Sequence, residues 1–281
     1  MSVITKKAFK VDGKDFRVNV ETYNSAMEVA QDCKVRKNTS PCFHDYKTHT
    51  IKQDWHGVGS YEEALTLLRD GYQPTVEKLA ASFKMSVNGT QKRMSFQNSV
   101  AGFAPVVPLA LKGVPNSMIS TTIKPMKCKV VDVYYDMGVS SGTSTEQIIE
   151  NGQKVLAAIL DLEKQGFRFN LYAVQAYSDY RSADILCVKV KSSDKPIDIK
   201  RISFPLTHPA FFRVIGFDWY GKCPVATYRD GYGQALTSNV HDYKEFGKQV
   251  FGDGSIYISC NSIKHQGIDH IKETLTGGER K

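Results

Sequence analysis

The stretch CKVVDVYYD, residues 128–136, decides the fold, because it is rich in the β-branched and aromatic residues that a central strand needs. The small hydroxyl residues of MGVSSGTS (137–144) follow it. Apolar residues then recur at helical spacing over 145–165, and Gly166 ends the helix that this pattern predicts. Either of two capping boxes can start this helix, Ser144 with Gln147 or Thr143 with Glu146.

Two further strands follow this helix. FRFNLYAV (167–174) and DILCVKVK (184–191) alternate as strands and are separated by a polar turn. A strand, a capped helix and a strand form a βαβ unit, so we expect the first two strands to be parallel neighbours. The third strand comes after only a short link, which favours an antiparallel neighbour.

The pattern of residues 127–281 predicts an α/β domain with a doubly wound, mostly parallel sheet and one antiparallel strand. Residues 1–126 predict a smaller α+β region before it. Within that region Pro105, Pro108 and Pro115 interrupt an apolar run, so we interpret residues 100–119 as a buried irregular connector. The other predicted elements of the first half are a hairpin at 8–20, a helix at 60–71 and a second helix after it, with Val76, Leu79, Ala80 and Phe83 on one face. Helices at 208–216, 239–251 and 266–275 and a strand at 255–260 are predicted in the second half.

Composition limits the classes of protein. The chain has 281 residues, 41% of them hydrophobic, which suits a globular protein with a real core. No window has the roughly 18 unbroken apolar residues of a membrane span, and the first residues lack the apolar core of a signal peptide. The six cysteines form no CxxC pair and favour free thiols. We therefore expect a cytoplasmic protein, in the host cell if a phage encodes it, and no membrane partner.

The formal net charge of +8 is unevenly distributed. Residues 1–126 hold 17 Lys and Arg against 11 Asp and Glu. This half is the better candidate for contact with nucleic acid, through Lys78, Lys84, Lys92 and Arg93. A solvated basic face is the alternative, because no dense basic run or aromatic-interleaved basic run occurs.

The loop after residues 128–136 is the candidate metal site. The carboxyl end of a strand is where ligands commonly bind in such sheets, and Asp136, Ser140 and Ser141 supply the oxygen atoms that a hard cation prefers. The alternative is that Asp136 accepts hydrogen bonds from backbone N–H groups of the turn. On this interpretation the aspartate ends the strand and holds no ion.

The order strand, Asp-x-x-x-Ser loop, helix, strand, antiparallel strand resembles the von Willebrand factor A-type domain. Its metal-ion-dependent adhesion site begins Asp-x-Ser-x-Ser, and the resemblance aligns Asp136, Gly138 and Ser140 with these positions. Gly138 has no hydroxyl, so one ligand is missing, and Ser141 or a water would have to replace it. The resemblance therefore implies a degenerate site. We expect no resident metal, with Mg²⁺ as the cation that this loop would take.

The first half adds a second likeness. The stretches WHGVGSYEEALTLLRDGY (55–72) and GVPNSM (113–118) are similar to uncharacterised proteins of tailed phages and mobile elements, in which such a region precedes a von Willebrand A-like half. This likeness implies a phage or mobile-element origin and implies no activity.

Other candidate chemistry is sparse. His44, His49 and His56 lie near Cys42 without the spacing of a zinc finger, and no nucleophile elbow, zinc protease motif or phosphate-binding loop occurs. An enzyme is therefore less favoured than a binding protein. Arg213, Trp219 and Tyr220 are residue types that dominate interface energies, although core packing also explains them. The sequence favours a non-enzymatic interaction or assembly protein that binds a protein partner or itself, with association with nucleic acid as the alternative.

Overall fold

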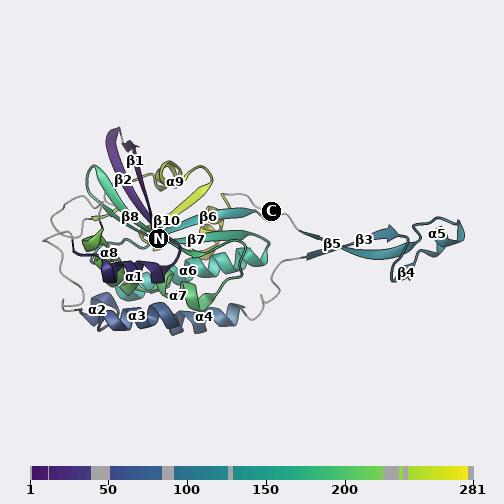
Figure 1. The fold of residues 1–281 in the computed structure, drawn as a ribbon, viewed down its shortest axis with the longest axis horizontal. Helices are drawn as coiled ribbons and strands as arrows, with labels where there is room; N and C mark the ends of the chain where they lie inside the picture. Colours follow the sequence, from purple (N-terminus) through teal and green to yellow (C-terminus); the bar gives the residue numbers. More distant parts are fainter. Residues whose placement is uncertain are drawn as a thin grey trace.

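The computed structural model describes residues 2–11, 13–38, 51–83, 92–125, 129–223, 234–236 and 240–277. Figure 1 shows a body in which helices lie against a β-sheet, and a narrow arm that projects away from the body. The arm consists of residues 92–125 and is described with the candidate site.

The centre of the body is the predicted strand–helix–strand unit. β6 (Val130–Asp136) and β7 (Arg168–Ser178) are parallel neighbours, and α6 (Thr145–Lys164) connects them. Ser144 caps α6, because its hydroxyl accepts a hydrogen bond from the N–H of Gln147 at 3.3 Å. β8 (Ser182–Lys191) runs antiparallel to β7. The parallel pairing of β6 with β7, the helix that connects them and the antiparallel pairing of β7 with β8 are therefore confirmed.

The rest of the sheet corrects the predicted fold class. β1 (Val3–Val11) and β2 (Lys14–Tyr23) form an antiparallel hairpin, and β2 joins β8 in parallel. β10 (Ser255–Ser259) lies parallel to β6, and β9 (Gln234–Ala235) pairs antiparallel with the end of β7. The strand order is β1-β2-β8-β7-β6-β10. The prediction of a doubly wound, mostly parallel sheet with one antiparallel strand is therefore wrong. Among the described strand pairs of this sheet, β1–β2, β7–β8 and β7–β9 are antiparallel, and β2–β8, β6–β7 and β6–β10 are parallel.

Two short turns explain the mixed directions. Val11 lies opposite Lys14, so the first hairpin reverses over two residues, and Gly13 adopts the positive φ of 78° that such a turn requires. Between β7 and β8, one carboxylate oxygen of Asp179 accepts the N–H groups of Arg181 and Ser182 at 2.8 Å. Links this short cannot cross over to a parallel neighbour. The segment from β6 to β8 thus keeps the predicted order of strand, helix, strand and antiparallel strand, whereas the sheet around it differs from the one that the von Willebrand A-type resemblance implies.

The predicted boundary between residues 126 and 127 does not separate two cores. β1 and β2 come from the first half and complete the sheet of the second half. α3 (Tyr61–Asp70) and α4 (Gln73–Phe83), also from the first half, pack against α7 (Ile199–Thr207). α3 begins and ends as its sequence predicts, with the Ser60 hydroxyl accepting the N–H of Glu63 and Gly71 following its last residue.

Helices cover both faces of the sheet unequally. The larger apolar core lies under α6, α7 and most of the other helices, and the smaller core lies between the opposite face and α9 (Tyr243–Phe251). Phe211–Gly216 form a π-helix, η1, that continues into α8 (Phe217–Lys222). The remaining helices of the body are α1 (Ala26–Val35), α2 (Gln53–His56), α10 (Cys260–Ile263) and α11 (Ile268–Thr276).

Candidate functional site

Asp136 ends β6 in a closed polar cluster. Its Oδ1 accepts the N–H of Gly138 at 2.8 Å and that of Ala176 at 3.3 Å, and its Oδ2 accepts the hydroxyl of Tyr257 at 2.8 Å. The side chain is fully buried, and this burial raises the pKa of the carboxyl group to about 7 against the lowering effect of the three hydrogen bonds. The predicted capping of the turn by Asp136 is confirmed.

The two serines of the candidate metal site lie apart from this cluster. Ser140 and Ser141 are exposed, the Ser140 hydroxyl accepts the N–H of Gly142, and the Ser141 carbonyl accepts the indole N–H of Trp55. Within the described part of the chain, no three His, Cys, Asp or Glu side chains are gathered as a metal site would require. His44, His49 and Cys42 lie outside the described residues.

The side chain of Arg213 connects three segments of the body. Its side chain is fully buried, and the guanidinium donates to the carbonyl of Trp55 and, at 2.7 Å, to that of Thr143. The same group lies 4.4 Å from the centre of the Trp55 ring, which is a cation–π contact. Arg213 therefore ties together α2, the loop before α6 and η1.

Trp219 and Tyr220 are also fully buried. The indole N–H of Trp219 donates to Glu21 at 2.9 Å, and Tyr220 stacks on Tyr177. The prediction of a partner surface at Arg213, Trp219 and Tyr220 is therefore wrong. The alternative that the sequence left open, core packing, describes this cluster.

Of the four basic residues predicted to contact nucleic acid, Lys78 is the one whose side chain the structure describes. Lys78 donates to the side-chain carbonyl of Gln153 at 2.6 Å, on the helical side of the body. Lys84 lies outside the described residues, and the side chains of Lys92 and Arg93 are not among those described.

The arm is the most exposed apolar feature of the described chain. β3 (Lys92–Ser99) pairs antiparallel with β5 (Met118–Pro125), and the short β4 (Ala104–Pro105) adds to the other edge of β5. α5 (Val107–Leu111) lies at the tip, far from the body (Figure 1). The large hydrophobic side chains that the arm exposes are Phe96, Val100, Phe103, Val107, Leu111 and Val114.

Backbone contacts give the tip of the arm a definite shape. The N–H of Phe103 donates to the carbonyl of Ile119 at 2.9 Å, and that of Val106 donates to Ser117 at 2.7 Å. Gly102 lies so close to β5 that an added Cβ would be 2.0 Å from the carbonyl oxygen of Ile119. The rings of Phe96 and Phe103 meet edge to face at 6.2 Å. These contacts fix the conformation of the tip.

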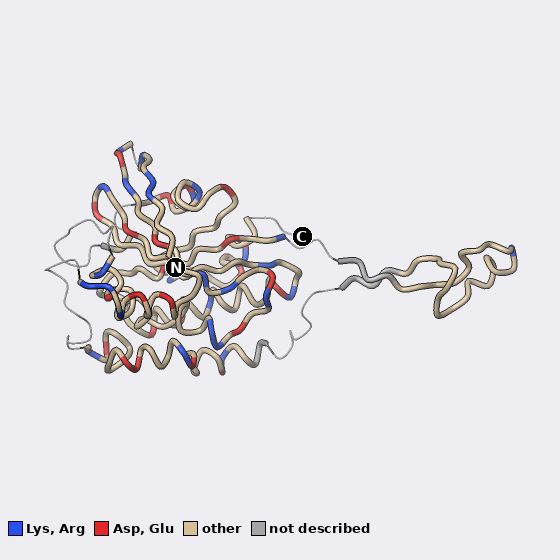
Figure 2. Tube along the Cα trace, in the orientation of Figure 1, with Lys and Arg blue, Asp and Glu red and all other residues tan. Residues whose placement is uncertain are grey.

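The arm carries almost no charge away from its base, where Lys92, Arg93 and Lys124 lie at the start of β3 and near the end of β5. Lys112 is the one charged residue in positions 94–123, within a chain that is 23% charged overall. Figure 2 shows this contrast, with basic and acidic segments over the body and an almost uncoloured arm. The prediction that residues 100–119 form a buried connector is wrong, because Phe103 is 65% exposed and Leu111 is 83% exposed.

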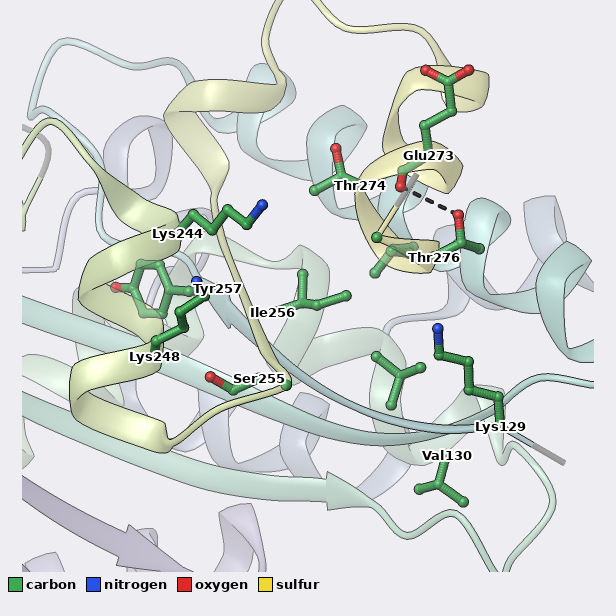
Figure 3. A pocket seen from close by; sticks show the side chains of 14 residues that line it. Lys129, Val130, Lys244, Lys248, Ser255, Ile256, Tyr257, Glu273, Thr274 and Thr276 are labelled. Carbon is green, nitrogen blue, oxygen red and sulfur yellow. Dashed lines mark hydrogen bonds between the residues drawn. The ribbon is translucent and has the colours of Figure 1, made fainter. Parts of the chain in front are cut away.

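A second apolar surface lies at the edge of the main sheet. β10 is the last strand on this side, and a pocket of about 630 Å³ opens over it between α9 and α11 (Figure 3). Val130, Ile256 and Leu275 line the pocket, with Lys244 and Lys248 at its α9 side. Because Lys129 and Val130 are the first described residues after the arm, this pocket lies where the arm returns to the body.

Comparison with known families places the whole described fold in one family. A family model described as a domain of unknown function, DUF7192, matches residues 4–277. The chain belongs to this family. Because the DUF7192 match includes both predicted halves, the arm lies inside the family domain. Comparisons with curated proteins and with solved structures found no match.

The described helices and cysteines of this DUF7192 protein have the following properties. Among the described helices, none combines the length and the apolar character needed to cross a membrane. Cys33, Cys187, Cys223 and Cys260 are buried thiols.

Proposed function

We propose that this DUF7192 protein is a non-enzymatic interaction or assembly protein, which inserts the tip of its arm into an apolar groove of a partner protein. The observation that carries the proposal is the exposed apolar surface of the arm. Its side chains lie on an ordered hairpin, so a partner can bind them without a large cost in conformational entropy.

Exposure of large apolar side chains to water costs free energy. Burial of a large aliphatic or aromatic side chain contributes roughly 1.5–3 kcal/mol. An arm that projects into water with six such side chains therefore forgoes a large gain unless another molecule covers them. The near absence of charge suits the dry centre of a protein interface, where charged residues are depleted.

The proposal keeps several expectations from the sequence. We expect the protein to work in the cytoplasm, where its free thiols stay reduced, and to be encoded by a phage or mobile element. Association with nucleic acid remains the alternative, and salt separates the two. Binding through phosphate weakens steeply as salt rises, whereas an apolar interface does not.

Site-specific photo-crosslinking in the native host tests the proposal. A photo-reactive residue replaces Phe103 or Leu111 in the arm, and the matched control carries it at Tyr180, which is equally exposed on the body. We expect the arm positions to crosslink one protein, either a host or phage protein or a second copy of the chain, at a defined peptide. Crosslinks to lipid, or the same pattern from Tyr180, would contradict the proposal.

Binding between the purified partners then measures the contribution of the arm. Phe96→Ser, Phe103→Ser and Leu111→Ser combined should weaken binding at least tenfold, because each change removes apolar area from the interface. The control combines Val35→Ser with Tyr180→Ser, which removes exposed apolar side chains from the body. Equal affinity for both variants would show that the arm is not the binding surface.

A further inference from the structure

A cationic pocket lies at the outer edge of the main sheet, on the side opposite to β10. It has a volume of about 500 Å³ and is bounded by β1, β2 and the turn between β7 and β8. Four basic residues and one acidic residue line it from these three segments. The full lining is Lys6, Lys7, Ala8, Arg17, Asn19, Asp179, Arg181 and Ser182. Figure 2 shows basic segments along β1 and β2.

The strand register explains why a hollow forms there. Arg17 lies between Ala8 on β1 and Ser182 on β8, and residues that face each other across strands share one side of the sheet. Both neighbours are small, so they leave space around the Arg17 side chain. Lys6 stands two residues from Ala8 on the same side of β1. The pocket thus has a floor of small side chains and a basic rim.

The backbone holds the two arginines side by side. The N–H of Arg17 donates to the carbonyl of Arg181 at 2.9 Å. The turn that carries Arg181 is itself fixed, because Asp179 accepts the N–H groups of Arg181 and Ser182 and also the Ser182 hydroxyl at 3.1 Å. Two guanidinium groups are therefore attached at adjacent, well-defined points of the fold.

No carboxylate of the described chain forms an ion pair with Lys6, Arg17 or Arg181. Asp179, the acidic residue of the lining, accepts N–H groups of the turn, and the buried Asp184 accepts the side-chain N–H of Asn19 at 2.8 Å. Basic side chains outnumber the single carboxylate in this lining, and such an excess of positive charge attracts an anion. Guanidinium groups present paired N–H donors that match the oxygens of a phosphate group.

We propose that this pocket binds a phosphate group through Arg17, Arg181 and Lys6. The ligand is either a free phosphate compound or the backbone of a nucleic acid, since both present the same chemistry. This inference is independent of the arm, which is a separate surface of the molecule.

Calorimetric titration of the purified full chain tests the pocket, with inorganic phosphate, pyrophosphate and a short single-stranded DNA as separate probes at constant ionic strength. We expect Arg17→Gln combined with Arg181→Gln to weaken binding of the preferred probe at least tenfold. The matched control combines Arg69→Gln with Arg201→Gln, two exposed arginines on the helical layer. It should leave the affinity unchanged.

The outcomes separate the sources of phosphate. Tight binding of DNA that inorganic phosphate does not displace identifies nucleic acid, and saturable binding of phosphate or pyrophosphate alone identifies a free ligand. Equal binding by wild type and both double variants would overturn the proposal, as would no binding of any probe. Arg17→Lys is a milder variant that keeps the charge, and it should retain part of the affinity if the double variant folds poorly. Serine variants of the arm should bind phosphate like wild type.

Discussion

Asp136→Asn is expected to remove a pH-dependent loss of stability. Burial raises the pKa of the Asp136 carboxyl group in the folded protein to about 7, from an ordinary value of 3.8. The folded state therefore binds this proton more tightly than the unfolded state does. The stabilisation is complete below about pH 4 and is lost as the pH rises through about 7.

The size of the effect follows from the difference between the two pKa values. Each pH unit corresponds to about 1.4 kcal/mol, so a difference of about three units gives up to about 4 kcal/mol between acid and neutral pH. Asparagine keeps a carbonyl oxygen for the N–H groups of Gly138 and Ala176, and its amide can donate to the Tyr257 hydroxyl. The substitution thus removes the titration while it preserves the hydrogen bonds.

Urea unfolding at a series of pH values, followed by the fluorescence of the buried Trp219, measures this difference. Subtracting the wild-type free energy of unfolding from that of Asp136→Asn cancels the groups that titrate equally in both proteins. The difference should increase in favour of the variant as the pH rises from about 4 to about 8. A constant difference over this range would refute a raised pKa for Asp136. The companion variant Asp136→Ala should lose about 1 kcal/mol or more, because it leaves backbone donors of the turn without an acceptor.

Three further changes have defined expected outcomes. Gly152→Ala should destabilise the protein by about 1–3 kcal/mol in thermal unfolding, because its Cβ would meet the carbonyl oxygen of Leu206 at 2.3 Å; an unchanged melting temperature would contradict this packing. Glu21→Gln should cost about 2 kcal/mol near pH 7, since charged hydrogen bonds to Trp219 and its other partners are weakened, and the cost should vanish in acid, where Glu21 is protonated. Phe103→Ser should change the free energy of unfolding by less than about 0.5 kcal/mol, because its side chain is mostly exposed, and a larger loss would show that the arm packs on the body.

The sequence predicted local structure well where one signal was sufficient. The spacing of apolar residues over 145–165 predicted α6, and the Ser60 capping box predicted the start of α3. The Asp136 cap was also predicted. A carboxylate directly after a buried strand finds its hydrogen-bond donors mainly among the backbone N–H groups of the next turn. These elements depend on neighbours within a few residues.

Long-range arrangement was predicted less well. Nothing in the pattern of β2 indicates that it lies beside β8, because an alternating strand specifies its faces and not its partner. Arg213 and Trp219 looked suited to an interface, but residue type alone cannot distinguish an interface from a core. The arm was missed because apolar residues with prolines normally indicate burial. The strand-like segments on either side of residues 100–117 were a signal for the arm, because they pair with each other as an antiparallel hairpin.

The separateness of the arm has a consequence for folding and for engineering. The buried hydrophobic side chains identified in the body end at Leu79 before the arm and resume at Val131 after it, so the arm adds nothing to either core. Its strands pair with each other across the tip at residues 100–117, so their contacts lie within the arm and can form without the long-range sheet. The body should therefore fold at nearly the same rate when the arm is replaced by a short flexible linker, because closing a shorter loop changes the entropy only slightly. The same junction becomes a place where a different recognition hairpin can be grafted onto this scaffold.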